Sequence, residues 1–319
     1  MSASTLLAPS SLPVTVSPSP LCETTPTLSI AAAQKRSARA SAVCRLLHAP
    51  HRLGLDAPLV AVGWQCWWAR WTGAPLGWPE HAVLFLAVWL IYLADRLADG
   101  AALSPDAIPH ASARHRFAHR HRRPLLLLLV VIGATLAALA CRSLNVGEFR
   151  AGLVLLTLET GYFISVHGRH ARGPSRELSR WPWMKEAWVG VSFAFGSAFF
   201  TLCQSAQTEP WMIFFVSLFA LLCFLNCALI SQWETPATMR AAAGSSTLRR
   251  TCVVLLLVAV AGGFFLGQNI VLPLVLGAAG LRALDGDFAA RRLTLETRRV
   301  LADVALLTPW LLLAAARWI

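Results

Sequence analysis

The segment Thr251–Leu281 contains no charged residue, and it is too long for one ordinary helix that crosses a bilayer. Gly267, Gln268 and Asn269 interrupt it near the middle, so the segment predicts a helical hairpin with two crossings. Within a bilayer every backbone polar group has to be bonded internally, and α-helices satisfy this requirement. This segment therefore predicts an all-α membrane protein.

Seven other apolar runs have lengths near the roughly 20 residues that a helix needs to cross a bilayer. They are Asp56–Trp71, Glu80–Asp99, Pro124–Cys141, Glu148–Val166, Pro182–Cys203, Pro210–Trp233 and Val300–Ile319. Together with the hairpin they predict a polytopic membrane helical bundle of about nine transmembrane helices.

The composition supports this fold class. Hydrophobic residues make up 56% of the chain and charged residues only 14%, and the mean hydropathy is +0.57. A typical soluble domain carries about 25% charged residues. The polar surface is too small to coat a water-soluble body of this size, and the pattern also excludes a largely disordered, collagenous or coiled-coil chain.

The basic residues test the number of spans independently, because loops on the cytoplasmic side of a membrane are enriched in Lys and Arg. With a cytoplasmic amino terminus, the loops after the second, fourth, sixth and eighth spans are cytoplasmic. These loops hold Arg114, Arg116, Arg120, Arg122 and Arg123; Arg169, Arg172, Arg176 and Arg180; Arg240, Arg249 and Arg250; and Arg291, Arg292, Arg298 and Arg299. We therefore expect an integral protein of a bacterial inner membrane, with its amino terminus in the cytoplasm. The net charge of +12 reflects orientation and predicts no nucleic-acid partner.

Residues 1–55 differ from the rest of the chain. They are rich in Ser, Thr, Pro and Ala, and Glu23 is the only acidic residue before Asp56. We interpret them as a disordered tail or an over-extended translation start, and a Ser- and Arg-rich transit peptide is the alternative. The transmembrane domain is expected to span residues 56–319.

Tyr92, Asp95 and Asp99 fall at positions i, i+3 and i+7, on one stripe of the second predicted span. The two carboxylates repel each other and lie at the carboxyl end of a helix, where the macrodipole disfavours negative charge. Cations are expected to balance them. Mg²⁺ combines one or two carboxylates with phosphate oxygens, so the pair predicts a magnesium–diphosphate site. The alternative is a solvated helix end with Arg96 pairing locally.

This pattern resembles the UbiA superfamily of intramembrane prenyltransferases, whose first signature reads NDxxDxxxD. Aligned on Ile91, Tyr92, Asp95 and Asp99, the last two acids are present, whereas the leading Asn and Asp are replaced. The resemblance covers roughly residues 56–319 and includes the nine spans and the basic loop after the second. It implies a helical bundle with a cavity, Mg²⁺ as cofactor, and a prenyl diphosphate as substrate.

The second acidic motif of that family, DxxxD, follows the sixth span. Here Glu234 takes the place of the first acid, but Thr238 occupies the position four residues later. The resemblance implies that Glu234 joins Asp95 and Asp99 as a metal ligand, although half of the second motif is missing. Asn226, in the apolar part of this span, either lines a substrate pocket or bonds to a neighbouring helix.

Basic residues are candidates for holding the diphosphate. In the family, a basic residue near the start of the fifth span faces this group, which implies a catalytic role for Lys185; the alternative is an interfacial Lys paired with Glu186. Arg114 and Arg116 lie in the densest basic run and either bind diphosphate or face anionic lipid. Two more acids, Glu159 and Asp303, fall inside predicted spans, where ionisable groups are functional candidates.

The sequence thus predicts transfer of a prenyl group from a prenyl diphosphate to a lipophilic acceptor, such as an aromatic ring. The predicted catalytic residues are Asp95, Asp99 and Lys185, and the substrate-binding residues are Tyr92, Arg114, Arg116, Asn226 and Glu234. The alternative function is that of a non-catalytic protein of the same fold, which binds or transports a lipophilic small molecule within the bilayer.

Overall fold

The computed structural model describes residues 53–102, 113–170, 183–205, 210–234, 245–266 and 269–315. Within these ranges the chain is helical and contains no strand, so the predicted all-α class is confirmed. All of them belong to one compact unit, Leu46–Ile319. The predicted tail, residues 1–55, lies outside the described residues except for its last three.

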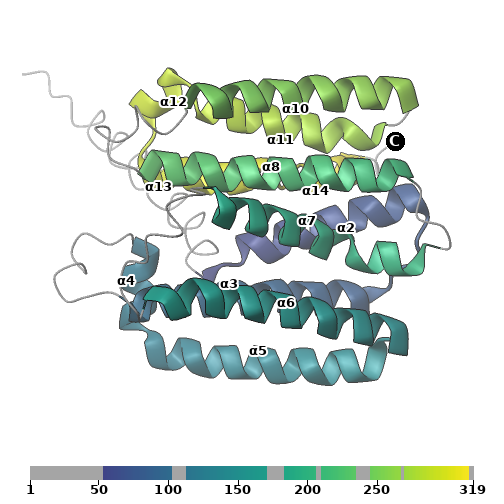
Figure 1. Cartoon of the computed structure of the whole chain (residues 1–319), viewed down its shortest axis with the longest axis vertical. Coiled ribbons are helices and arrows are strands. Elements are labelled where there is room, and N and C mark those ends of the chain that lie inside the picture. Colours follow the sequence, from purple (N-terminus) through teal and green to yellow (C-terminus); the bar gives the residue numbers. More distant parts are fainter. Residues whose placement is uncertain are drawn as a thin grey trace, which may run out of the picture. The chain divides into compact units, whose positions relative to one another are not determined.

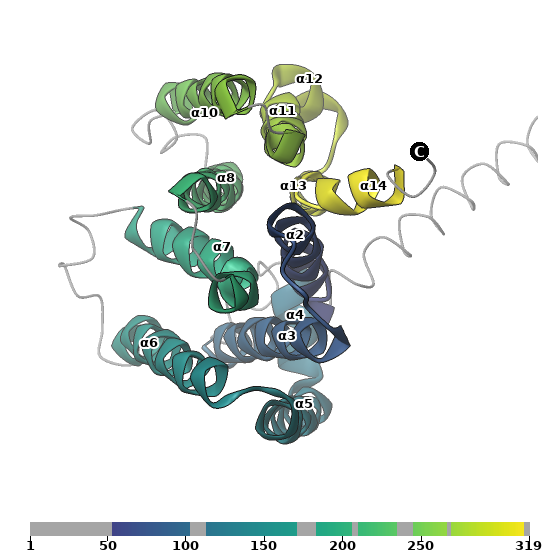
Figure 2. The ribbon, with the colours of Figure 1, turned by 90° about the vertical axis from the view of Figure 1, so that its right-hand side faces the viewer.

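Long helices lie side by side (Figure 1; Figure 2). In chain order the helices are α2 (Asp56–Thr72), α3 (Trp78–Ala101), α4 (Ala113–Arg120), α5 (Arg122–Ser143), α6 (Val146–His170), α7 (Met184–Gln204), α8 (Pro210–Glu234), α10 (Ser245–Leu266), the 3-10 turn η3 (Asn269–Val271), α11 (Leu272–Leu284), α12 (Asp287–Arg292), α13 (Leu295–Ala305) and α14 (Thr308–Ala315).

Five helices of the described part are long and apolar enough to cross a membrane. They are α3, α5, α7, α8 and the segment Thr247–Phe265 of α10. The structure therefore supports a polytopic membrane protein, with five candidate membrane-spanning helices in the described part. The remaining predicted spans correspond to α2, which has 17 residues, to α6, to the shorter apolar helix α11 and to the pair α13 and α14.

The predicted hairpin is present, because α10 ends at Leu266, α11 begins at Leu272 and the two helices pack together. The last predicted span, Val300–Ile319, is instead broken into α13 and α14 by a turn at Leu306 and Leu307. Pro309 explains the break, since proline has no backbone N–H to donate to the carbonyl four residues earlier. The backbone N–H groups of Leu306 and Leu307 bond to Asp303 and Val304, three residues back, which tightens the turn.

The largest hydrophobic core surrounds α8. Phe215, Phe219 and Leu222 of α8 are fully buried, and Trp64 of α2 stacks on Phe219 with ring centroids 3.8 Å apart. Small buried residues of α7 (Ala194 and Ala198) bring that helix close to α8. A second cluster joins α3, α4 and α5. The first core fixes the elements that surround the candidate site.

Two tryptophan indoles of α2 donate hydrogen bonds to backbone carbonyls at places where other helices are interrupted. Trp64 donates from Nε1 to the carbonyl of Leu306, in the turn between α13 and α14, at 3.0 Å. Trp67 donates in the same way to Ile270, in η3, at 3.0 Å. Helix breaks leave carbonyl oxygens without an intrahelical donor, and a buried indole N–H supplies one. These contacts anchor α2 to both breaks.

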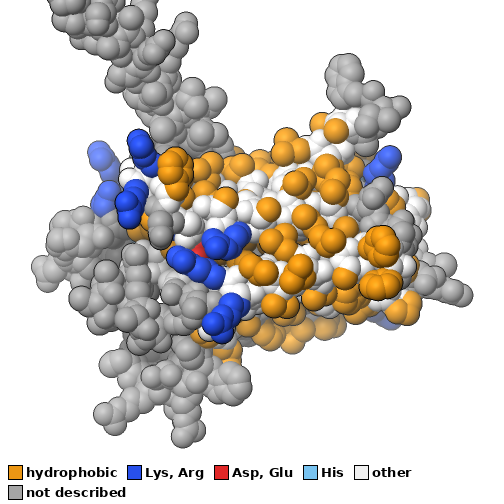
Figure 3. All heavy atoms as spheres, turned by 90° about the horizontal axis from the view of Figure 1, so that it is seen from above, with side chains coloured by type: hydrophobic (Ala, Val, Ile, Leu, Met, Phe, Trp, Pro, Cys, Tyr) orange, Lys and Arg blue, Asp and Glu red, His pale blue; other side chains and the backbone are white. Residues whose placement is uncertain are grey.

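The short basic helices α4 and α12 lie at the same end of the long helices (Figure 1). Lys and Arg side chains on the face that carries α10 and α12 also gather mainly toward that end, while hydrophobic side chains cover much of the remainder (Figure 3). This distribution is the one expected for a membrane protein whose basic end faces the cytoplasm. We call this end of the bundle the basic end.

Candidate functional site

The carboxyl end of α3 lies at the basic end and carries Asp95 and Asp99. Asp99 is a third exposed, and its Oδ2 lies 3.4 Å from Nε2 of His115 on α4. Residues 95 and 99 are one turn apart on the same helix, and both side chains are partly buried. The helix macrodipole disfavours negative charge at this end of α3. The basic side chains of the neighbouring helix α4 offset this unfavourable electrostatic energy of the two carboxylates.

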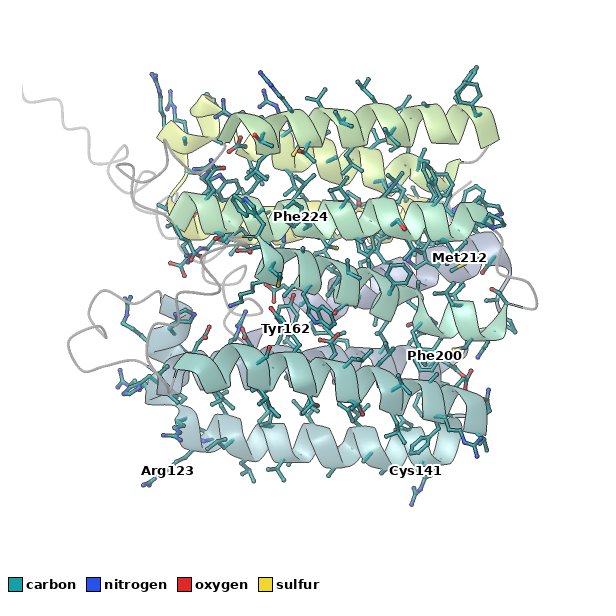
Figure 4. All side chains as sticks on the ribbon, viewed as in Figure 1. Arg123, Cys141, Tyr162, Phe200, Met212 and Phe224 are labelled. Atoms are coloured by element: carbon teal, nitrogen blue, oxygen red, sulfur yellow. The ribbon has the colours of Figure 1, made fainter. Side chains whose placement is uncertain are left out.

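Tyr162 of α6 contacts the start of α7. The Tyr162 hydroxyl of α6 donates to the backbone carbonyl of Lys185 at 3.4 Å, and its ring stacks on Trp188 of α7 with centroids 5.3 Å apart. The same hydroxyl lies within electrostatic range of Asp95 and of Glu186. Figure 4 shows Tyr162 between α6 and α7. Lys185 itself is exposed, so its ammonium group is accessible.

Tyr92 and Asn226 line one small cavity between helices. The cavity has a volume of about 40 Å³, and its polar lining also includes Asp56 of α2 and Asp303 of α13. Asn226 donates from Nδ2 to Oδ1 of Asp303 at 3.1 Å. Phe193 of α7 contributes an apolar wall and meets the Tyr92 ring edge-on, with centroids 6.5 Å apart. The structure thus brings the two predicted substrate-binding residues Tyr92 and Asn226 together in one place.

Glu234, at the carboxyl end of α8, forms an ion pair with Arg299 of α13. Arg299 is 8% exposed, so Glu234 neutralises a buried cation. Among the described residues, no group of three or more His, Cys, Asp and Glu side chains is placed to hold a metal ion. In magnesium–diphosphate sites, one or two protein carboxylates are enough to hold the ion, because phosphate oxygens supply the other ligands. Magnesium binding by Asp95, Asp99 and Glu234 stays a prediction.

A second polar network at the basic end ties α8, α10 and α11 together. Asp285 follows α11 and is 7% exposed. Its Oδ1 accepts from Nε1 of Trp233 at 3.1 Å, and its Oδ2 accepts from Nε of Arg249 at 2.8 Å. The Arg298 guanidinium lies over the Trp233 ring, 4.1 Å from its centroid, and donates to the carbonyl of Leu284. This network supports the helix ends that surround Glu234.

We expect Arg249→Gln to lower the stability of the folded protein by about 1–3 kcal/mol, because it removes a charged hydrogen bond from the buried Asp285 carboxylate. Thermal unfolding of the purified protein measures the loss. Arg250→Gln is the matched control, since this neighbour is exposed and removes the same charge from the same segment. Equal unfolding temperatures for the two variants would contradict a stabilising role for the network.

The other predicted residues lie on α4. Arg116 is exposed at the surface of the basic end, and the Arg114 side chain lies outside the part that the structure describes. Three residues near the candidate site were missed as site residues by the sequence reasoning: Asp56, Arg96 and Tyr162. Tyr162 could have been found from the sequence, because it is a polar residue inside an apolar run. The approach of Asp56 to Arg96 depends on tertiary packing, so the sequence gives no signal for it.

Two linked polar regions therefore occupy the half of the bundle near the basic end. One contains Asp95, Tyr162 and the start of α7, and the other is the cavity at Tyr92 and Asn226. Carboxylates, amide and phenol groups next to exposed cations can bind a polar head group whose lipophilic part remains in the bilayer. No protein-family model, curated protein or solved structure matches this chain.

Proposed function

We propose that the protein is a UbiA-like membrane prenyltransferase that transfers a prenyl group from a prenyl diphosphate to a lipophilic acceptor. In this proposal the chain crosses a bacterial inner membrane nine times, with its amino terminus in the cytoplasm. The α2, α6, α11 and α13–α14 segments then cross the membrane in addition to the five long apolar helices. The position of α4 and α12 at one end of the bundle supports this orientation.

One observation carries the proposal: a single stripe of α3 joins the interior cavity to the basic end. Tyr92 lines the cavity, Asp95 lies within electrostatic range of Tyr162, and Asp99 approaches His115 of the basic helix α4. A substrate with a charged head and an apolar tail needs this combination at a membrane surface. The head binds at the carboxylates and cations, and the tail extends between helices into hydrocarbon.

The charge of the diphosphate determines which groups hold it. Lys185 and Arg116 are exposed near the candidate site and supply positive charge to phosphate oxygens. Asp95 and Asp99 would hold Mg²⁺, which neutralises the leaving diphosphate when it is bound. Glu234 belongs to this set in the proposal, although it already forms an ion pair with Arg299.

In the proposed reaction, the bond between the allylic carbon and the diphosphate oxygen breaks, and the diphosphate leaves with the electron pair. The allylic carbon then forms a bond to the acceptor, such as a carbon of an aromatic ring, and the acceptor loses a proton. Positive side chains near the departing oxygen stabilise the charge that develops on it. The apolar helix faces around the tail keep water from the allylic cation.

Binding or transport of a lipophilic molecule without chemistry is the second candidate function. The pairs Glu234–Arg299 and Asp99–His115 favour it, because two of the three predicted acidic ligands already contact basic side chains. In this case the cavity and the stripe of α3 bind a head group but do not activate a leaving group.

The test uses purified protein in lipid nanodiscs, radiolabelled prenyl diphosphates of increasing chain length and a panel of lipophilic aromatic acceptors. With Mg²⁺ we expect prenylated product and an equal amount of released diphosphate, and with EDTA we expect neither. Saturable binding of a prenyl diphosphate without product would support the second candidate. If no prenyl diphosphate binds or reacts, the proposal of prenyl transfer is wrong.

A further inference from the structure

The outer side of α10 joins an exposed cation to a stripe of exposed apolar side chains. Arg250, Val254, Leu257 and Phe264 follow one another at intervals of four, three and seven residues, so they lie on one side of the helix. All four are exposed, whereas Leu255 on the opposite side is buried in the core. Because α10 is apolar enough to cross a membrane, acyl chains cover this stripe in a bilayer. The stripe therefore provides an acyl chain with an apolar contact that ends at a positive charge.

The short helix α12 adds positive charge at the same end of α10. Arg249, the neighbour of Arg250, donates to the side chain and to the backbone carbonyl of Asp285. Asp285 comes two residues before α12, so these bonds fix α12 near the start of α10 (Figure 1). Arg291 and Arg292, in the last turn of α12, are exposed. Together with Arg250 they form a basic surface that we call the α10–α12 patch.

The side chains of α12 are those of a helix in the membrane interface. Phe288 is 76% exposed, while its neighbour Ala289 is buried. The guanidinium of Arg292 lies over the Phe288 ring, 5.9 Å from its centroid. A helix that exposes an aromatic ring beside arginines lies at the boundary between lipid head groups and acyl chains. The arginines of α12 are therefore at the depth of lipid phosphates.

The guanidinium groups of the patch are available to an external anion. In the part of the chain that the structure describes, Arg250, Arg291 and Arg292 form no ion pair with a carboxylate, in contrast to Arg249 and Arg299. Guanidinium groups bind phosphate oxygens through parallel hydrogen bonds. The ammonium group of a zwitterionic lipid is repelled by the same arginines. We propose that the α10–α12 patch binds one anionic phospholipid, with its phosphate at the arginines and an acyl chain along the outer stripe of α10.

The α10–α12 patch is separate from the candidate functional site. α10 and α12 lie on one side of the bundle and α3 and α6 on the other, with α8 between them (Figure 1; Figure 2). Binding of a lipid at the patch therefore goes beyond prenyl transfer and does not depend on it. The test contains no prenyl diphosphate, so its outcome is independent of the proposed function.

The test measures lipid binding to the purified full-length protein in a non-ionic detergent. Native mass spectrometry counts the bound lipid molecules during titration with phosphatidylglycerol or with phosphatidylcholine of the same acyl chains. We expect the first phosphatidylglycerol molecule to bind roughly tenfold or more tightly than phosphatidylcholine, because only the former has a net negative charge. Equal affinities for the two lipids would overturn the proposal.

Variants then locate the binding site. The double substitution Arg291→Gln and Arg292→Gln is expected to weaken phosphatidylglycerol binding by roughly 30-fold, since each arginine beside an anionic head group contributes about fivefold. Arg250→Gln, on the other helix of the patch, should weaken it by about fivefold. All three residues are exposed, so the unfolding temperatures without added lipid should equal that of the wild-type protein.

The matched control is the double substitution Arg122→Gln and Arg123→Gln at the start of α5. It removes the same charge from exposed positions at the basic end of the bundle, where Figure 4 labels Arg123. The control should bind phosphatidylglycerol with wild-type affinity. An equal loss in both double variants would mean that only the general positive charge attracts the lipid, and the proposal would be wrong. Wild-type affinity in either variant of the patch would also overturn it.

Discussion

Replacement of Asp95 by asparagine is expected to lower the rate of prenyl transfer by roughly 100-fold or more. The two side chains have nearly the same shape, so the change removes charge and little packing. Without the carboxylate, the stripe of α3 loses one of the two acids that would hold a metal-bound diphosphate. The measurement is steady-state formation of prenylated product in nanodiscs.

The matched control is Glu80→Gln at the opposite end of the same helix. Glu80 accepts from the backbone N–H of Gly77 at 2.8 Å, and glutamine keeps an oxygen for this bond. Product formation by the control should equal that of the wild-type protein. If Asp95→Asn retains turnover, or if both variants lose activity to the same extent, the proposed role of Asp95 is wrong.

The helical elements were predictable because each long apolar run is a local property of the chain. The hairpin at residues 251–281 follows from the absence of charge and from the polar interruption near Asn269, and the structure contains it. The ends of the helices depend on local signals as well. For example, Asn145 and Glu148 cap α6 reciprocally, with each side chain accepting from the backbone N–H of the other residue.

The break between α13 and α14 could have been predicted from Pro309, because a proline inside an apolar run interrupts the hydrogen bonding of the preceding turn. The hydrogen bond that compensates for this break could not have been predicted. Trp64 lies 242 residues away in sequence, and its indole supplies the donor that the carbonyl of Leu306 needs. The hydropathy of residues 300–319 predicts one span. The packing of α2 against the turn instead stabilises two shorter helices, because it supplies a hydrogen-bond donor at the break.

The contacts of the candidate site could likewise be predicted only in part from the sequence. The spacing of Tyr92, Asp95 and Asp99 predicts one helix face, and that face exists. The spacing does not show which basic side chain lies next to each acid: Glu234 contacts Arg299 of α13, and Asp99 approaches His115 of α4. The buried bond from Asn226 to Asp303 also joins distant segments. These contacts depend on how α3, α8 and α13 pack, which no local pattern contains.

The close packing of α7 on α8 predicts that the substitution Gly190→Ala strongly lowers the stability of the protein. A Cβ atom at residue 190 would lie 2.8 Å from the carbonyl oxygen of Ala220 and 2.8 Å from the backbone N of Phe224, both on α8. Backbone atoms cannot move aside as a flexible side chain can. Gly190, Ala194 and Ala198 follow one another at intervals of four residues, so small side chains let the two helices approach closely. Figure 4 labels Phe224 on the α8 segment concerned.

We expect Gly190→Ala to destabilise the protein by roughly 3 kcal/mol, because the cost of overpacking exceeds the gain in helix propensity of about 1 kcal/mol. Thermal unfolding in detergent measures the change. Gly196→Ala lies on the same helix, where a new Cβ meets no atom within 4 Å, and it should leave the protein unchanged or slightly more stable. The two variants differ only in what the added methyl group meets. A Gly190→Ala protein as stable as Gly196→Ala would therefore mean that α7 and α8 are farther apart than the structure has them, and that the core around Phe219 is packed differently.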